Sequence, residues 1–276
     1  QLGLSPRGQN RLTDHLSGLG FAMDKAVEAG LLIRSDRGIY RDFFRGRLMF
    51  PIHDRKGRIN GFGARSLDNT EPKYINTPTT PTFDKRSTLY GLHLALDSIR
   101  EQDKVIVVEG YMDAITAHQH GYTNVVASMG TALTEQQVGQ LKSRATNFVL
   151  ALDADAAGQE ATRRSLETSW QIFERHQIQG RTRSVGPLYR STRLELSIVM
   201  LPKGYDPDEL IREQPVEWER LVNEAIPFVD YALPAFASIH DLTNEHGKAQ
   251  AAETLLPLIT ATGNAFDQER YFRKLS

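Results

Sequence analysis

The segment KVIVVEGYMDAITAHQHGYTNVVASMG, residues 104–130, decides the fold of this chain. It opens with a short β-branched apolar run, which is typical of a buried strand. Residues 111–121 then have a helical pattern that Gly121 ends, and a second apolar run follows at residues 123–130. A parallel connection between two strands needs a long crossover, which is usually a helix. The segment therefore predicts an α/β fold with a parallel sheet.

The same alternation continues towards the C-terminus. We expect a helix at residues 131–145, where Thr134 and Gln137 have the spacing of a capping box. Four more elements follow in the pattern: a strand in 147–158, a helix at 159–177, a strand in 193–204 and a helix opening at 205–214. Such an alternation predicts a doubly wound sheet with helices on both faces.

The two ends of the chain have other patterns. Residues 1–32 predict two short helices, and residues 39–66 predict strands joined by tight turns, with a hairpin turn at 54–58. Residues 69–86 contain so many prolines and threonines that we expect a loop. Residues 223–276 have helical spacing only. We predict a mixed α/β and α+β chain of three subdomains: a basic N-terminal one at 1–100, a parallel-sheet one at 101–222 and a small helical one at 223–276, broken at Pro227, Pro234 and Pro257.

Composition excludes several classes of protein. With 40% hydrophobic and 24% charged residues and a mean hydropathy of −0.41, the chain resembles an ordinary globular protein, and we expect no membrane association. It has no cysteine, which excludes disulfide frameworks and thiolate zinc sites. Because the sequence starts at Gln1 without a leader, we expect an excised piece of a longer protein.

Charge is distributed unevenly although the net charge is only −1. Residues 1–100 contain 16 Lys and Arg against 10 Asp and Glu, whereas residues 101–276 contain 17 against 24. A basic half beside an acidic half suits a protein that binds a polyanion with one part and cations with the other. Chance variation on solvated faces is the alternative explanation.

Carboxylates follow three of the four predicted strands. Because the carboxyl ends of parallel strands meet at one edge of a sheet, these side chains are expected to converge. Carboxylate oxygens are the preferred ligands of Mg²⁺ and Mn²⁺. Two such ions, one at the attacking hydroxyl and one at the leaving pyrophosphate, are what nucleotidyl transfer uses. The candidate metal ligands are Glu109, Asp153, Asp155, Asp206 and Asp208.

Each of these carboxylates also has a purely structural explanation. Glu109 with Gly110 is compatible with a plain strand end and turn, and the two aspartates at 153 and 155 with the cap of the next helix. Asp206 suits an N-cap, because Pro207 then takes the first helical position. The coincidence of three such placements favours the metal site.

Several motifs resemble one known family. The runs VVEGYMD, ASMGTALT and ALDADAAG are similar to the TOPRIM fold of topoisomerases and primases. The upstream runs FRGRLMFPIHDRKGRINGFGARSLD and PKYINTPTTPTFDKRSTLYGL, with KGYDPDEL downstream, resemble bacterial replicative primases of the DnaG type. The resemblance covers nearly the whole chain and corresponds to the central RNA polymerase core. In that family the core lies between a zinc-binding and a helicase-binding domain.

The resemblance implies roles for individual residues. Glu109, Asp153 and Asp155 match catalytic metal-site positions, and Asp206 and Asp208 match further metal positions. Two or more Mg²⁺ or Mn²⁺ ions would bind there, and no zinc in this part of the protein. The positions that match nucleotide or template contacts are Arg45, Arg47, Arg65, Lys73, Tyr74, Asn76 and Lys85.

The implied function is the synthesis of short RNA primers on single-stranded DNA from ribonucleoside triphosphates. The implied setting is the bacterial cytoplasm, at the replisome, with the replicative helicase and single-strand-binding protein as partners through other regions. Two alternatives remain: a TOPRIM-type metal-dependent nuclease or topoisomerase, and a non-catalytic scaffold that binds nucleic acid. Intact carboxylates count against the scaffold, since clustered negative charges repel one another.

Overall fold

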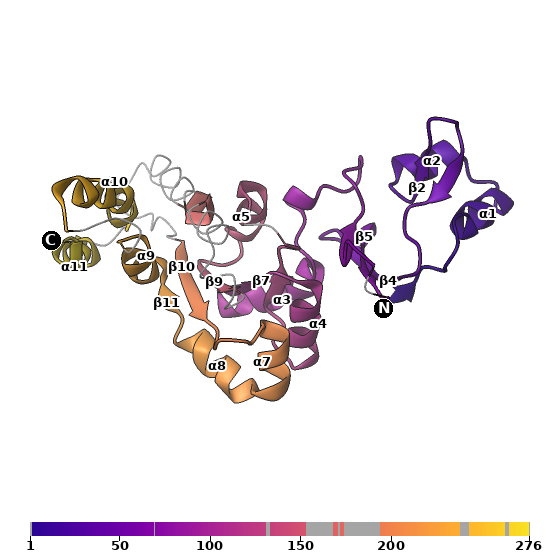
Figure 1. The fold of residues 1–276 in the computed structure, drawn as a ribbon. Coiled ribbons are helices and arrows are strands. Elements are labelled where there is room, and N and C mark those ends of the chain that lie inside the picture. Colours follow the sequence, from indigo (N-terminus) through magenta and orange to yellow (C-terminus); the bar gives the residue numbers. More distant parts are fainter. Residues whose placement is uncertain are drawn as a thin grey trace, which may run out of the picture. The chain divides into compact units, whose positions relative to one another are not determined.

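The structure is a computed structural model, which describes residues 2–68, 70–130, 133–152, 168–170, 172–173, 194–237, 243–262 and 265–275. The chain divides into two compact units, Gln1–Leu94 and Ala95–Ser276. This division falls within helix α3 (Leu92–Gln102). The finer division into 1–100, 101–222 and 223–276 stays a prediction. Figure 1 labels the elements along the chain.

The first unit is built on an antiparallel sheet in the order β1-β4-β5-β6. Its strands are β1 (Gly3–Leu4), β4 (Arg47–His53), β5 (Ile59–Ser66) and β6 (Tyr74–Asn76). The predicted turn between β4 and β5 is confirmed: Asp54 donates its N–H to the carbonyl of Arg58 at 2.8 Å, and Gly57 has a φ of +76°. Phe50, Ile52 and Phe83 are among the buried core residues of this first unit.

The first unit also contains α1 (Arg11–Gly18), α2 (Met23–Glu28) and a two-stranded ribbon of β2 (Leu32–Arg34) and β3 (Tyr40–Asp42). The two predicted N-terminal helices are therefore confirmed. The expectation of a pure loop at 69–86 was wrong, because that segment contains β6 and a 3₁₀ turn, η1 (Lys85–Ser87). Backbone pairing with β5, Arg65 opposite Tyr74, outweighs the weak local strand propensity.

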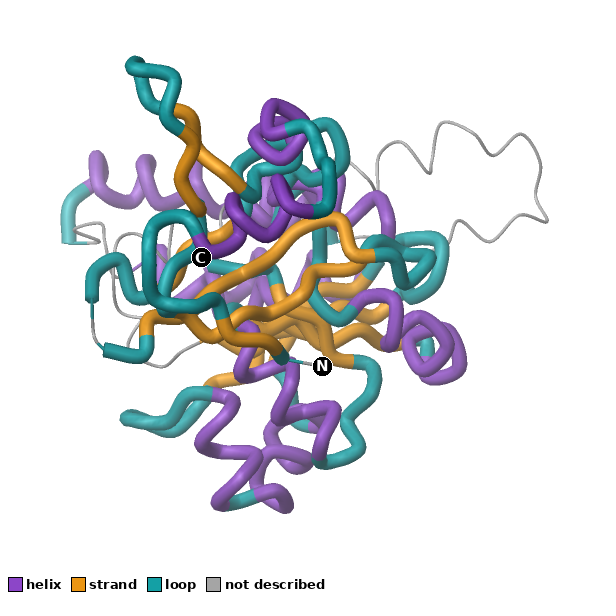
Figure 2. The backbone as a smooth tube through the Cα atoms, turned by 90° about the vertical axis from the view of Figure 1, so that its right-hand side faces the viewer, coloured by secondary structure: helices purple, strands orange, loops and turns teal. Residues whose placement is uncertain are grey.

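The second unit contains the predicted parallel sheet. Its order is β11-β10-β9-β7-β8, and only β11 (Ile226–Pro227) is antiparallel to its neighbour. The parallel strands are β7 (Lys104–Val108), β8 (Val125–Ala127), β9 (Asn147–Leu152) and β10 (Glu195–Met200). Their helices are α4 (Tyr111–Gln119), α5 (Glu135–Leu141), α7 (Pro207–Glu213) and α8 (Pro215–Asn223), which are labelled in Figure 1. Figure 2 distinguishes helices from strands by colour.

Local signals account for much of this unit. The capping box of α5 is confirmed: Gln137 donates its N–H to Oγ1 of Thr134 at 3.2 Å, and Thr134 donates its N–H to Oε1 of Gln137 at 3.1 Å. Gly121, which ends α4, has a φ of +90° that disfavours side chains. The strands β7, β8 and β9 are apolar and almost wholly buried, as a parallel sheet covered on both faces requires.

The C-terminal part is mostly helical: α9 (Phe228–Ala237), α10 (Glu245–Ala261) and α11 (Ala265–Leu275). The expectation of helical structure only, broken at three prolines, was wrong in detail. Pro227 lies in strand β11, and Pro234 and Pro257 lie inside α9 and α10. A proline inside a helix costs about 3 kcal/mol. Burial of apolar residues of these helices, such as Phe228 and Ile259, outweighs that cost.

Candidate active site

Glu109 lies directly after β7, at the carboxyl end of the strand. Along the chain, β8 follows β7 and pairs with one edge of it, and β9 then pairs with the opposite edge of β7. In open parallel sheets, ligands bind at the carboxyl edge where the strand order reverses in this way. Glu109 therefore lies at the position in the sheet where a binding site is most expected.

The backbone around Glu109 is fixed by hydrogen bonds on both sides. Its carbonyl oxygen accepts the N–H of Gly130, which follows β8, at 3.1 Å. The next residue, Gly110, caps α4 and donates its N–H to Oδ2 of Asp113 at 2.8 Å. Met129 is buried and has a φ of +65°, a conformation that is uncommon for a residue with a side chain. The backbone on either side of Glu109 is thus held by specific hydrogen bonds.

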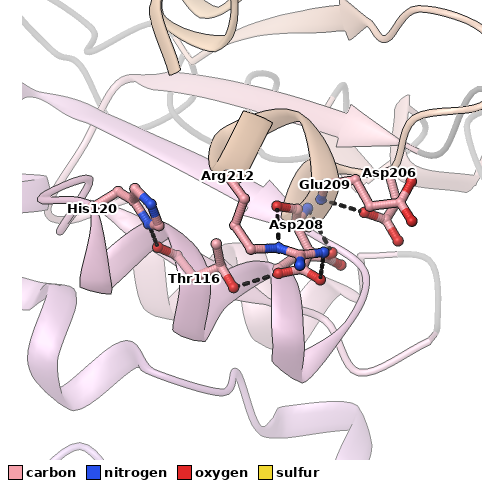
Figure 3. Close-up of polar contacts among 7 residues, drawn as sticks. Thr116, His120, Asp206, Asp208, Glu209 and Arg212 are labelled. Carbon is pink, nitrogen blue, oxygen red and sulfur yellow. Dashed lines mark hydrogen bonds and ion pairs between the residues drawn. The ribbon is translucent and has the colours of Figure 1, made fainter. Parts of the chain in front are cut away.

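Asp206 is the N-cap of α7. Its Oδ1 accepts the N–H of Glu209 at 2.7 Å (Figure 3). Pro207 takes the first helical position. The structural explanation considered for Asp206 is therefore confirmed. Capping engages Oδ1 of Asp206.

Asp208 joins α7 to α4. Its Oδ1 accepts the hydroxyl hydrogen of Thr116, and its Oδ2 lies 3.0 Å from Nη2 of Arg212 (Figure 3). Its own N–H is donated to Oδ1 of Asp113 at 3.2 Å. The side chain of Asp208 is only 16% exposed. Both carboxylate oxygens of Asp208 therefore have protein partners.

Sequence reasoning missed Asp113, Thr116 and Arg212. A signal for each exists: Asp113 follows Gly110 at capping-box spacing, Thr116 lies one turn later, and Arg212 lies four residues after Asp208. His120, the C-cap of α4, donates Nδ1–H to the carbonyl oxygen of Thr116 at 2.8 Å (Figure 3).

The carboxylates suit a hard divalent ion by their chemistry. Among the residues that the structure describes, however, no three acidic or histidine side chains are grouped closely enough to hold a metal ion. Two of the five candidate ligands, Asp153 and Asp155, lie outside the described residues. Strand β9 ends at Leu152, immediately before them, and pairs with β7.

The candidate nucleic-acid residues of the first unit differ in burial. Arg47 is 8% exposed, and its Nη1 donates to the carbonyls of Pro72 and Lys73 at 2.8 and 3.3 Å. Arg47 therefore holds the segment before β6 against β4. Arg45 is exposed, and Asn76 and Lys85 are half-buried. Burial lowers the pKa of Lys85.

Arg65, Lys73 and Tyr74 form a cationic and aromatic surface on β5 and β6, which we call the Tyr74 surface. Tyr74 is 39% exposed, and the Arg65 guanidinium carbon lies 5.9 Å and the Lys73 amine 6.0 Å from the centroid of its ring. An exposed ring with two cations nearby is a combination that single-stranded nucleic acids bind, by stacking on the ring and by phosphate contact with the cations.

In the described part of the chain, no helix is long and apolar enough to cross a lipid bilayer.

Two family models match the chain. The first describes the N-terminal domain of the DNA primase catalytic core and matches residues 1–96; the second describes a Toprim domain and matches residues 103–180. The chain is 38% identical over 245 residues to a DNA primase of Clostridium acetobutylicum, which covers 82% of this chain and 37% of the relative. To a DNA primase of Escherichia coli K12 it is 36% identical over 261 residues, covering 94% and 42%. The chain thus spans about two fifths of the length of these curated relatives.

Solved structures agree with these matches. A DnaG primase catalytic domain bound to single-stranded DNA superposes with a TM-score of 0.80 at 32% identity, covering 99% of this chain and 83% of that one. A DNA primase domain from Pseudomonas aeruginosa gives a TM-score of 0.81 at 33% identity, with 100% and 81% covered.

Proposed function

Because this chain belongs to the DnaG-type family of bacterial DNA primases and corresponds to their catalytic core, we propose that it polymerises short RNA primers on single-stranded DNA. The reaction is metal-dependent nucleotidyl transfer from ribonucleoside triphosphates, the chemistry of a DNA-directed RNA polymerase. The single observation that carries this proposal is the position of Glu109 at the reversal point of the Toprim sheet.

Toprim primases in general use divalent metal ions. In this chain we assign Glu109, Asp153 and Asp155 to holding Mg²⁺ or Mn²⁺, and Asp206 and Asp208 to the outer part of the same site. Bound ions would lower the charge on the phosphates and activate the attacking 3′-hydroxyl. The carboxylates themselves orient the ions, and no protein nucleophile is required.

The first unit would bind template or nucleotide phosphates. We assign contact roles to Arg45, Arg65, Lys73, Tyr74, Asn76 and Lys85, and a supporting role to Arg47, whose guanidinium bonds to backbone carbonyls. An arginine that binds phosphate through two parallel hydrogen bonds does not read the base sequence, which suits an enzyme that starts on many templates.

The partners follow from this reading. They are a single-stranded DNA template, ribonucleoside triphosphates and the RNA product, and at the replisome the replicative helicase and single-strand-binding protein, through other regions of the whole protein. The setting is the bacterial cytoplasm. A related catalytic domain has been solved with single-stranded DNA bound.

The test is incorporation of labelled ribonucleotides on single-stranded DNA with Mg²⁺ or Mn²⁺, for the parent and for Glu109→Gln. Glu101→Gln is the matched control, because Glu101 is exposed at the end of α3. We expect RNA product from the parent and the control and none from Glu109→Gln. Metal-dependent cleavage of the DNA without RNA product would favour a nuclease. DNA binding without either reaction would favour a scaffold.

A further inference from the structure

We propose that Asp113 is a positioning residue that holds the N-terminal end of α7, with Asp206 and Asp208, against the start of α4 beside Glu109. This inference rests on the proposed metal site. It assigns to Asp113 the task of fixing the distance between the candidate ligands, and not the task of binding the ion.

The carboxylate of Asp113 accepts two backbone N–H groups that are far apart in the sequence. Its Oδ2 accepts from Gly110 at 2.8 Å, at the start of α4, and its Oδ1 accepts from Asp208 at 3.2 Å, at the start of α7. Asp113 is 7% exposed. A negative charge at the positive ends of two helices is favourable, which explains how it tolerates burial.

Thr116 adds a second bond between the same two helices. It lies one turn after Asp113 on α4, is 3% exposed and donates its hydroxyl hydrogen to the Asp208 carboxylate. The backbone N–H and the side chain of Asp208 are therefore both bound by α4. Asp113 and Thr116 act as one pair of contacts.

These contacts matter because the position of α7 depends on its contacts with the rest of the fold. It has only seven residues, too few for a stable isolated helix. The approach of several carboxylates to one ion also needs support, since they repel one another before the ion binds. Replacing a residue that hydrogen-bonds to a metal ligand commonly weakens metal affinity by about 10- to 100-fold.

The experiment compares Mn²⁺ binding by titration calorimetry with thermal unfolding in the absence of metal. The variants are Asp113→Asn, Thr116→Val and Thr116→Ser, with Asp97→Asn as the exposed control on α3. We expect Asp113→Asn and Thr116→Val each to weaken Mn²⁺ binding about 10-fold without changing the number of ions bound. Thr116→Ser keeps the hydroxyl and should bind as the parent does. If Asp113→Asn fails to fold, the Thr116 pair still tests the proposal.

Two results would overturn the proposed positioning role. Loss of one bound ion in Asp113→Asn, with parent-like binding in Thr116→Val, would make Asp113 a ligand. Lower unfolding temperatures with unchanged Mn²⁺ affinity would make both residues structural only. Glu109→Gln is measured alongside: parent-like Mn²⁺ binding there would overturn the proposed metal site and, with it, this role.

Discussion

The guanidinium of Arg212 lies 3.0 Å from Oδ2 of Asp208, one turn earlier on the same helix. Its Nε also donates to the Asp208 carbonyl oxygen at 3.3 Å. Because both residues belong to α7, this ion pair cannot hold α7 against α4. The hydroxyl of Thr116, which reaches Asp208 from α4, can do so. The two partners of one carboxylate thus have different structural roles.

This difference predicts unequal costs of substitution. We expect Arg212→Gln to lower the free energy of unfolding by at most about 0.5 kcal/mol, since Arg212 is half-exposed and the pair lies within one helix. Thr116→Val leaves a carboxylate oxygen without its buried donor and should cost about 1–3 kcal/mol. Urea unfolding measures both values. Equal losses of unfolding free energy in the two variants would contradict a role of the Thr116 hydrogen bond in holding α7 against α4.

Capping and cation binding can be separated at Asp206. Asparagine caps a helix as well as aspartate does, so Asp206→Asn should unfold like the parent, whereas Asp206→Ala should lose about 1 kcal/mol. If the carboxylate charge serves the metal site, Asp206→Asn also lowers primer synthesis. Primer synthesis at the parent rate in Asp206→Asn would leave Asp206 as a cap alone.

The Tyr74 surface predicts a stacking contribution to template binding. Tyr74→Ala should weaken binding of single-stranded DNA by about 1–3 kcal/mol, and Tyr74→Phe should retain it. A plot of the logarithm of the binding constant against the logarithm of the salt concentration has a negative slope. Lys73→Ala should reduce the magnitude of this slope by about 0.7, which is the contribution of one phosphate contact on a single strand. Fluorescence anisotropy at several salt concentrations measures these effects. Tyr40, whose ring lies 5.6 Å from the Arg34 guanidinium, provides the matched control: an equal loss in Tyr40→Ala would contradict a specific surface.

Asp230 predicts a loss of stability in acid. Burial alone would raise its pKa, but hydrogen bonds from Lys274 and Tyr271 and the charge of Arg270 outweigh burial, and the pKa lies below the usual value. A lowered carboxylate pKa stabilises the fold above the unfolded-state value of about 3.9, and this contribution is lost as pH falls through the folded pKa. Attachment of α11 to α9 should therefore weaken below about pH 4.

The same cluster responds at the alkaline end. Burial, with the hydrogen bond to Asp230, raises the pKa of Tyr271 to about 12. Its stabilising contribution is present below the usual tyrosine pKa of about 10 and is lost as pH rises through the folded value.

The acid dependence is measured by thermal unfolding of the parent and of Asp230→Asn between pH 3 and 7, about the range where carboxylates titrate. The plots of unfolding temperature against pH should differ in slope. Parallel curves would exclude Asp230 as the source of the acid dependence, and Asp97→Asn, an exposed carboxylate, should follow the parent.

Local chemistry predicted the elements well where the signal acts within a few residues. The capping box of Thr134 with Gln137, the N-cap Asp206 before Pro207 and the turn at 54–58 all involve partners at most four residues apart. Errors arose where tertiary packing overrides local preference. Pro234 and Pro257 stay within helices, and β6 forms in a segment rich in turn residues because β5 supplies its hydrogen bonds.

The sequence by itself determined the alternation of strands and helices, the family and the placement of Glu109 at a strand end, because these depend on periodicity and on residues close together in the chain. Only the tertiary structure decided what Asp208 contacts. Its partners Asp113 and Thr116 lie more than 90 positions away in the chain, and no local pattern states which helix a seven-residue helix will lie against. That choice is made by packing and by the pairing of buried polar groups, which form only when the sheet has brought α4 and α7 together.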